Sequence, residues 1–373
     1  MLLLNPGPVT LTERVRHSML QPDLCHRESE FFDLQGEARA RLLEVHGLDP
    51  GEWAAVLMTA SGTGAVESMV SSLVPSTGRL LVVENGVYGA RIAQICDRYR
   101  IHHQRVIGSW MESPNLDDIA ALLDAEADTW PFTHLAIVHH ETTTGRLNDL
   151  ASLSHLCGPR GVKLLVDGVS SFGAEVIDFN DPAVDAVAAT ANKCLHGVPG
   201  AAFVIVRRDA LAAAVGRTYY LDLGRLCELQ DQRGTPFTPA VHAYYALVEA
   251  LREFMDQGGR AARYARYASL AEQVRAGLAG LGIGALLTAA ETSVVLRAYR
   301  LPAGFDYPAL HDAVKAQGFV IYAGQGDLSK TLFRISTMGN VTTHDMTRLI
   351  DSFAAVYRRP LPNTEGFRRL LDD

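Results

Sequence analysis

A single lysine, Lys193, stands among small and apolar residues in the segment ATANKCLHGVPG, residues 189–200. The apolar run 184–188 leads directly into this segment. An unpaired ammonium group at the end of a buried strand costs several kcal/mol, roughly the penalty of other buried polar groups. Desolvation lowers the pKa of a lysine, and the neutral amine is then a nucleophile that can form a Schiff base. A lysine that reaches from a strand end to solvent is the alternative that this segment alone leaves open.

An aspartate, Asp167, lies near the end of the apolar run VKLLVDG at residues 162–168. It precedes Lys193 by enough residues for one helix and one further strand. Because ligands of open α/β sheets bind at the carboxyl ends of strands, both side chains can face the same crevice. Pyridoxal phosphate needs such a pair, an amine for its aldehyde and an acid for its pyridine nitrogen. A loop or helix-capping aspartate is the structural alternative.

The segment MTASGTGAVES, residues 58–68, follows an apolar run and opens a helical pattern. Its residues Ser61, Gly62 and Thr63 lie where the free N–H groups and the dipole of a helix bind an anion. The segment is not a dinucleotide fingerprint, because Glu67 stands where the third glycine is required. The pattern therefore predicts a phosphate site without a dinucleotide, although a simple helix N-cap has a similar sequence.

Apolar runs typical of strands alternate with helical patterns through the first half of the chain. We expect strands at 54–60, 79–85, 133–141, 162–168, 184–190 and 200–207, and helices at 64–74, 88–99 and 149–161. Strands that are apolar on both faces and alternate with helices predict a mostly parallel sheet covered by helices. A long helix near 240–257 is expected to link this part to a smaller α+β region with the order strand, helix, strand, strand, helix.

The bulk composition restricts the classes of partner. The chain has 373 residues, 48% hydrophobic and 20% charged, with a net charge of −8 and no lysine/arginine tract, which disfavours nucleic acid and anionic membranes. No apolar run reaches the roughly 18 residues that span a bilayer. The five cysteines form no C-x-x-C pair, which favours a reducing compartment, so we expect a soluble cytoplasmic protein. The adjacent histidine pairs do not have metal-ligand spacing, and no metal is expected.

Several motifs resemble those of the class V, fold-type I pyridoxal-phosphate aminotransferases over about residues 1–358. They are LLLNPGPVTL, SGTGAVE, NGVYGAR, VHHETTTGRLND, VDGVSSFG, ANKCLHGVPG, QGFVIYAG and LFRIS. The resemblance implies an α/β fold with a mostly parallel sheet between helices and a smaller α+β C-terminal domain. We accordingly expect an N-terminal segment near the active site at 1–15, a large domain at 16–250, a small domain at 251–358 and a tail at 359–373.

The resemblance also implies pyridoxal 5'-phosphate as the cofactor and a role for each matching residue. Lys193 would form the Schiff base and then move the proton, while Asp167 would pair with the pyridine nitrogen. The implied cofactor contacts are Ser61, Gly62 and Thr63 at the phosphate, Tyr88 stacked on the ring, and Thr142, Asn192 and Thr238 around it. Thr238 belongs to a segment, with Phe237, that extends into the neighbouring subunit in this family, so a homodimer with shared active sites is implied.

Three arginines are candidates for binding the substrates. Arg334, in TLFRIS, has a planar guanidinium that can bind an α-carboxylate through two hydrogen bonds. Arg217, in GRTYYLDL, matches an arginine of the class V members that act on aminoethylphosphonate. Arg27, in DLCHRESEFF, departs from those members, which carry an acidic, tryptophan-containing stretch there. Arg27 therefore either contacts a substrate anion or forms an ion pair with Glu28 or Glu30.

The resemblance implies a transaminase that moves an amino group between 2-aminoethylphosphonate and pyruvate, giving phosphonoacetaldehyde and L-alanine. Alanine–glyoxylate, serine–pyruvate or phosphonopyruvate transamination is the alternative within the family. A nucleotide-dependent dehydrogenase is disfavoured by the absent third glycine of the fingerprint. A non-catalytic protein that binds the cofactor is disfavoured because the expected elements leave no part of the chain for a DNA-binding module. The direction of the reaction stays open.

Overall fold

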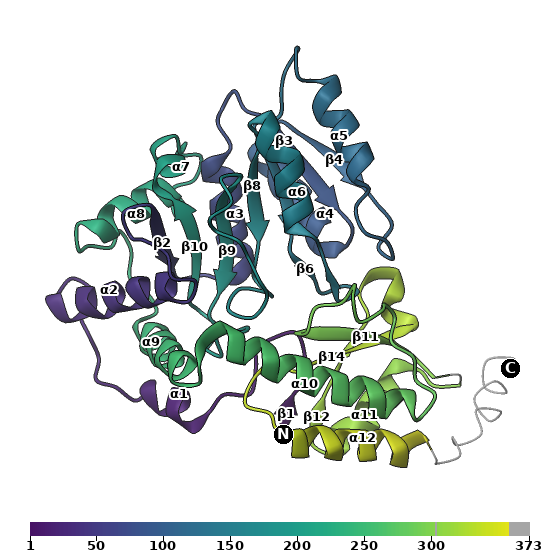
Figure 1. Cartoon of the computed structure of the whole chain (residues 1–373). Coiled ribbons are helices and arrows are strands. Elements are labelled where there is room, and N and C mark those ends of the chain that lie inside the picture. Colours follow the sequence, from purple (N-terminus) through teal and green to yellow (C-terminus); the bar gives the residue numbers. More distant parts are fainter. Residues whose placement is uncertain (303, 358–373) are drawn as a thin grey trace, which may run out of the picture.

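A seven-stranded sheet forms the centre of the computed structural model, which describes residues 1–302 and 304–357 (Figure 1). In order across the sheet, its strands are β2 (Trp53–Met58), β10 (Ala202–Arg207), β9 (Val184–Thr190), β8 (Lys163–Asp167), β5 (His134–Val138), β3 (Leu80–Glu84) and β4 (His103–Ile107). Neighbouring strands are parallel except at β10, which is antiparallel to both β2 and β9. Strands β2, β3, β5 and β9 are buried along their whole length, as is typical of a sheet with both faces covered.

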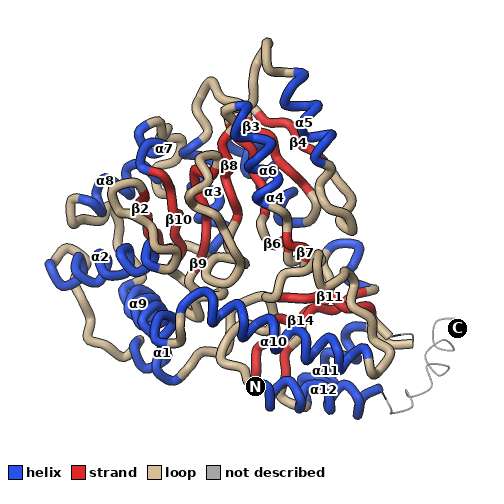
Figure 2. Tube along the Cα trace, viewed as in Figure 1, coloured by secondary structure: helices blue, strands red, loops and turns tan. Residues whose placement is uncertain are grey.

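Helices cover both faces of this sheet, and together they form what we call the large domain (Figure 2). One face packs against α2 (Ser29–Glu44), α5 (Leu116–Ala125), α6 (Leu150–Cys157) and α9 (Val241–Asp256). The other face packs against α3 (Gly62–Leu73), α4 (Val87–Tyr99) and α8 (Leu223–Asp231). Shorter elements at the margins are α1 (Glu13–Ser18), α7 (Arg208–Ala212), the 3₁₀ turn η1 (Gly158–Arg160) and the hairpin of β6 (His140–Glu141) and β7 (Arg146–Leu147).

A second, smaller group of elements, the small domain, lies below the large sheet in Figure 1. Its antiparallel sheet contains β11 (Leu296–Arg300), β14 (Leu332–Ser336) and β13 (Tyr322–Ala323), and η2 (Gly326–Lys330) precedes β14. Helices α10 (Gly259–Ala279), α11 (Tyr307–Ala316) and α12 (Thr343–Tyr357) enclose its core. The N-terminal strand β1 (Leu2–Leu3) pairs in parallel with β12 (Phe319–Val320), so the chain starts in the small domain before it crosses to the large one.

Most expected elements are present, with ends that differ by a few residues, and the predicted mostly parallel sheet is confirmed. Strand β4 and helix α5 were not expected, because edge elements with half-exposed residues lack a strong apolar pattern. The expectation that helix 240–257 links the domains was wrong. Helix α9 belongs to the large-domain core, and the link to α10 is Gly258–Gly259, where both residues have positive φ. The expected tail at 359–373 lies outside the described residues.

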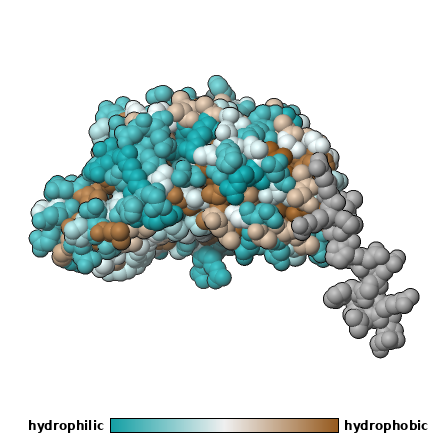
Figure 3. All heavy atoms as spheres, turned by 90° about the horizontal axis from the view of Figure 1, so that it is seen from below, coloured by the Kyte–Doolittle hydropathy of each residue, from teal (hydrophilic) through white to brown (hydrophobic). Residues whose placement is uncertain are grey.

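The underside of the molecule carries hydrophobic residues in small groups between hydrophilic ones (Figure 3). Among the helices of residues 1–302 and 304–357, none has both the length and the apolar character needed to cross a membrane.

The half-buried residue His46 packs its imidazole against the rings of Phe172 and Phe179, with centroids 4.8 and 4.7 Å away, and its Nε2 atom is buried. Burial, and then the charge of Arg260, lowers the pKa of His46 from 6.5 to about 3. Between these two pH values the unfolded chain binds a proton that the folded chain does not. The free energy of unfolding therefore decreases as the pH falls below 6.5.

We predict that His46→Phe reduces this loss in acid by up to about 1.4 kcal/mol per pH unit, because it removes one titrating group. Thermal unfolding measured from pH 7 to pH 4 checks it. His344→Phe, the same change at an exposed position, is the control and retains the wild-type pH dependence. Equal acid sensitivity of His46→Phe and wild type would contradict the prediction.

Candidate active site

A cavity of about 280 Å³ opens at the carboxyl ends of the central strands, beside the N-terminus of α3. Its lining includes Lys193, the turn Ser61–Thr63 and Gly7 of the N-terminal segment. A smaller cavity of about 30 Å³ contains Asp167 and shares Thr63, Tyr88, Arg91 and Val169 with the first. The structure thus brings together the lysine, the acid and the predicted phosphate turn.

Lys193 follows β9 in the loop that leads to β10, and the N-terminal segment lies against its side chain. Its Nζ donates a hydrogen bond to the carbonyl oxygen of Pro6. A Cβ atom on Gly7 would lie 2.7 Å from Cδ of Lys193, and the φ of Gly7 is +117°, so only glycine fits there. Desolvation lowers the pKa of Lys193 from 10.5 to about 8. A substantial fraction of the amine is therefore neutral, and nucleophilic, just above physiological pH.

Asp167 is the last residue of β8 and pairs with Val138 and Ala188 on the two neighbouring strands. Its Oδ1 accepts a hydrogen bond from the backbone N–H of Val169 at 3.0 Å. Burial, and to a smaller degree the charge of Glu141, raises the pKa of Asp167 to about 6. A buried carboxylate with increased proton affinity is well suited to share a proton with a ring nitrogen.

The turn at Ser61–Thr63 presents unused hydrogen-bond donors to the cavity. Ser61 is the N-cap of α3 but its side chain forms no capping hydrogen bond. Among the described residues, no hydrogen bond uses the backbone N–H of Gly62 or Thr63. A Cβ atom on Gly62 would lie 2.7 Å from a methyl group of Val169, so glycine is needed for the backbone to pass this close to Val169. The N-terminus of α3 therefore offers free donors and a favourable dipole to an anion.

Tyr88 and Arg91 occupy the first turns of α4 and face both cavities. The guanidinium carbon of Arg91 lies 4.7 Å from the centre of the Tyr88 ring, and its Nη1 donates to Thr63 Oγ1 at 3.1 Å. Arg91 forms no ion pair with an acidic residue of the described chain. Asn192 lines the larger cavity, and its Oδ1 accepts from the hydroxyl of Thr190 at 2.8 Å.

Arg334 of β14 is buried at the junction of the two domains. Its Nε donates to the carbonyl of Ala323 at 2.8 Å, and its Nη1 donates to the carbonyl of Thr142 at 2.8 Å and to Gln325 Oε1 at 3.0 Å. No carboxylate of the described residues forms an ion pair with it. A fixed, desolvated cation without a counter-ion favours an anionic ligand. The Thr142 side chain does not line either cavity, and the structure links Thr142 to Arg334 instead.

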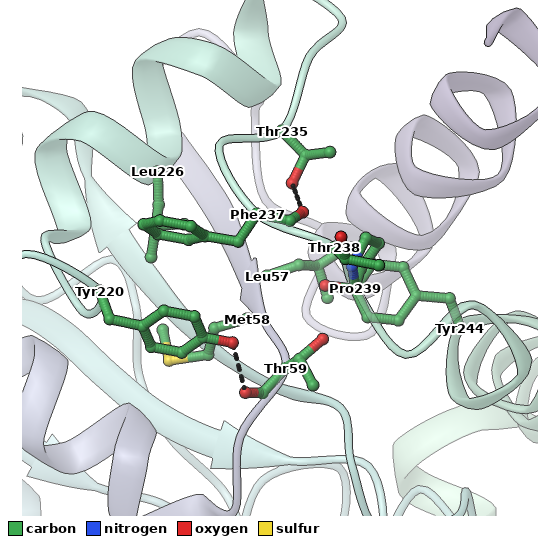
Figure 4. Close-up of a pocket in the computed structure, with 10 residues that line it drawn as sticks. All are labelled: Leu57, Met58, Thr59, Tyr220, Leu226, Thr235, Phe237, Thr238, Pro239 and Tyr244. Carbon is green, nitrogen blue, oxygen red and sulfur yellow. Dashed lines mark hydrogen bonds between the residues drawn. The ribbon is translucent and has the colours of Figure 1, made fainter. Parts of the chain in front are cut away.

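Thr238 lies apart from Lys193 in the same chain. It lines a separate cavity of about 20 Å³ with Thr59, Tyr220 and Phe237 (Figure 4). There the Tyr220 hydroxyl donates to the carbonyl of Thr59 at 3.2 Å, and the rings of Tyr220 and Phe237 stack with centroids 4.7 Å apart. The Thr238 side chain is exposed in the single chain.

None of the three predicted substrate arginines lines either cavity; Arg334 lies at the domain junction, and the other two lie elsewhere. Arg217 donates to the carbonyl of Ser71 at 2.9 Å and to that of Val74, so it satisfies the C-terminal end of α3. The Ser61–Thr63 turn is at the other end of this 12-residue helix, about 18 Å away. The structure therefore corrects the placement of Arg217 within one chain. Arg27 is exposed and forms none of the ion pairs expected with Glu28 or Glu30.

The sequence alone did not single out Arg91, Glu141 or Pro6; Arg91 lines both cavities, and Pro6 and Glu141 bind residues that do. Arg91 stands one helical turn after Tyr88 in NGVYGAR, a spacing that places both on one face of α4. Glu141 is the acidic residue of HETTTG, and Pro6 belongs to the N-terminal NPGP. The motifs contained these residues, but their contacts depend on segments that are far apart in the chain.

The residues present fit pyridoxal phosphate. Such a ligand requires an amine, an acid at the far end of a flat slot, an aromatic wall and an anion site. Here these are Lys193, Asp167, Tyr88 and the free donors at Ser61–Thr63. The described residues contain no group of three or more His, Cys, Asp or Glu that could hold a metal ion.

Comparison with known sequences gives a consistent result. The family model "Aminotransferase class-V" matches residues 23–323. The 2-aminoethylphosphonate–pyruvate transaminase of Bacillus cereus is 36% identical over 359 residues, which is 95% of this chain and 97% of that protein. The enzyme of the same name from Aeromonas hydrophila is 37% identical over 365 residues, covering 95% of this chain and 94% of the relative.

Solved structures agree with this assignment. An alanine–glyoxylate aminotransferase from Nostoc superposes with a TM-score of 0.88 at 26% identity, covering 96% of this chain and 95% of the other. A subgroup IV aspartate aminotransferase from Thermus thermophilus gives a TM-score of 0.86 at 27% identity, with 96% and 99% covered. The fold is therefore that of the fold-type I aminotransferases, and the chain belongs to the class V aminotransferase family, whose cofactor is pyridoxal phosphate.

Proposed function

We propose that this protein transfers an amino group between 2-aminoethylphosphonate and pyruvate, giving phosphonoacetaldehyde and L-alanine. The observation that carries the proposal is the 36–37% identity with transaminases of that name over 95% of the chain. Alanine–glyoxylate transamination is the second candidate, because the Nostoc enzyme shares 26% identity and nearly the whole fold.

When bound, pyridoxal phosphate supplies an aldehyde for the amine and a ring that withdraws electrons from the reacting carbon. Lys193 would provide the amine that attaches the cofactor, and it would afterwards remove the proton from the amino-bearing carbon of the substrate. Its lowered pKa of about 8 supports this role, since the neutral amine can accept the proton near neutral pH. Asp167 holds the proton at the ring nitrogen, and the Ser61–Thr63 turn with Asn192 fixes the phosphate.

Two cationic side chains make the site suitable for substrates with anionic groups. Arg334 binds the α-carboxylate of the keto acid and of the amino acid product through its guanidinium. Arg91, which lines the cavity, adds positive charge that suits a phosphonate, since a phosphonate carries more negative charge than a carboxylate. Arg217 has no direct contact with substrate in this proposal, and neither has Arg27, which lines neither cavity.

The active sites are shared within a homodimer in this proposal. The exposed Thr238 and the neighbouring aromatic residues Tyr219, Tyr220 and Phe237 would be covered by the second subunit, where Thr238 contacts the cofactor. Tyr219 is 76% exposed in the single chain, and exposed aromatic side chains are typical of interfaces. The separation of the two cores supports a large and a small domain, but the large-domain core includes Leu251 and Phe254 of α9, so the boundary lies after this helix rather than at 250. A cytoplasmic location fits the five unpaired cysteines.

We predict that Lys193→Ala abolishes the visible absorption band of the bound cofactor and reduces turnover by about 10³-fold or more, because both the attaching amine and the proton carrier are lost. Absorption spectra and a coupled alanine assay check it. The control is Lys163→Ala, which removes the lysine at the end of β8 opposite to Asp167. This variant should keep both the absorption band and the turnover. Retained transamination in Lys193→Ala would contradict the assignment.

Arg334→Lys should raise the KM for pyruvate by about tenfold to a hundredfold while the cofactor spectrum stays normal, because lysine lacks the Nη2 donors that Arg334 keeps free for the carboxylate. The matched control is Arg297→Lys, a buried arginine on the adjacent strand. Because Arg334 pairs with Ala298, the side chain of Arg297 points to the other face of the sheet. An unchanged KM in Arg334→Lys would remove its substrate role.

A panel of amine donors tests the substrate. The rate at which each donor converts the cofactor is followed by the loss of its visible band. We expect 2-aminoethylphosphonate to react at least about tenfold faster than β-alanine, its carboxylate counterpart, because the phosphonate gains the stronger charge-assisted contacts. Equal rates, or a preference for alanine with glyoxylate, would overturn the phosphonate assignment but not the transaminase assignment.

A further inference from the structure

The carboxylate of Glu141 joins the loop after β6 to the turn that carries Tyr88. Its Oε2 accepts hydrogen bonds from the backbone N–H groups of Tyr88 at 3.2 Å and Gly89 at 3.4 Å. Its Oε1 accepts from the backbone N–H of Thr143 at 3.0 Å and from the Thr143 hydroxyl at 2.5 Å. The same hydroxyl oxygen accepts from the N–H of Val87 at 3.1 Å. Two loops that are distant in sequence are thereby held by one charged group.

The environment of Glu141 is closed around this carboxylate. Glu141 is 0% exposed. A Cβ atom on Gly86 would lie 2.2 Å from Cδ of Glu141, so only glycine fits at this position of the turn before α4. Burial raises the pKa of Glu141 above its usual value, while the four N–H and O–H donors favour the ionised carboxylate and oppose this shift. Its place at the N-terminus of the 13-residue helix α4 adds the favourable field of the helix dipole.

The same loop also contacts the small domain. The carbonyl of Thr142, the residue after Glu141, accepts the hydrogen bond from Arg334 Nη1 at 2.8 Å. Residues 141–143 therefore connect the aromatic wall of the cavity to the arginine proposed to bind the substrate carboxylate. Glu141 itself lines neither cavity, so any effect on the reaction passes through its neighbours.

We propose that Glu141 is a positioning residue for the transamination: it holds Tyr88 over the cofactor site and holds the loop that supports Arg334. This role rests on the proposed assignment of the Lys193 cavity to pyridoxal phosphate. Without the carboxylate, the N–H groups at the start of α4 lose their partner and the Tyr88 turn is free to move.

The charge of Glu141 acts on the same site in a second way. It is one of the causes, after burial, that raise the pKa of Asp167 to about 6. Loss of this charge lowers the proton affinity of Asp167, so a shared proton would lie more on the ring nitrogen and less on the carboxylate.

Glu141→Gln tests the role, because it keeps the size of the side chain and removes its charge. The matched control is Glu175→Gln. Glu175 is also a buried glutamate that accepts from Ser293 Oγ at 2.6 Å and from the N–H of Val294 at 2.9 Å, but it lies outside both cavities. Titration of each apo-protein with pyridoxal phosphate gives the Kd, and the visible circular dichroism per bound cofactor reports how the ring is held.

We expect Glu141→Gln to weaken cofactor binding by about tenfold or more and to decrease the circular dichroism per bound cofactor. Glu175→Gln should change neither quantity, even where it lowers the melting temperature. Thr143→Val, which removes only the bridging hydroxyl, should act in the same direction by a few-fold, and it replaces Glu141→Gln if that variant does not fold.

Wild-type Kd and circular dichroism in Glu141→Gln, or in Thr143→Val as its replacement, would overturn the positioning role alone. Equal losses in Glu141→Gln and Glu175→Gln would also overturn it, because they would indicate a general effect of removing a buried carboxylate. A wild-type protein that binds no pyridoxal phosphate would instead overturn the proposed function, and this inference with it.

Discussion

Desolvation of the Lys193 amine determines how the surrounding structure must be built. A protonated lysine would be poorly nucleophilic, and an isolated charge at this depth would destabilise the fold. The apolar strand β9 carries the residue to the cavity, and the N-terminal segment closes over it so tightly that position 7 must be glycine. The result is a pKa near 8, within reach of the pH at which the enzyme is expected to work.

The rest of the site balances charges around this amine. Asp167 and Glu141 are buried acids, whereas Arg91 and Arg334 are cations that form no ion pair with an acidic residue in the described part of the chain. Cations left without partners, together with the free donors at the start of α3, give the site capacity for the phosphate of the cofactor and for an anionic substrate. The two domains meet here, because the small domain supplies Arg334 and the N-terminal strand while the large domain supplies the other groups.

Much of this could be predicted from the sequence, because Lys193, Asp167 and Ser61–Thr63 each stand at the end of an apolar strand. In a parallel sheet, such ends meet at one edge whatever the details of packing. Arg217 shows the limit of this reasoning: nothing local distinguishes a guanidinium that binds a ligand from one that binds the carbonyls at a helix end. The contacts of Glu141 and Pro6 depend on loops brought together by the tertiary fold. Strand β4 and helix α5 were missed because their residues are only partly buried.

The most direct test of this account is to identify the residue that binds the cofactor covalently. The protein is loaded with pyridoxal phosphate and reduced with borohydride, and its peptides are then analysed by mass spectrometry. The account predicts one modified lysine, Lys193, at close to one cofactor per chain. The variant Lys193→Ala should carry no covalently bound cofactor. Modification of another lysine, or a reduced protein without bound cofactor, would contradict it.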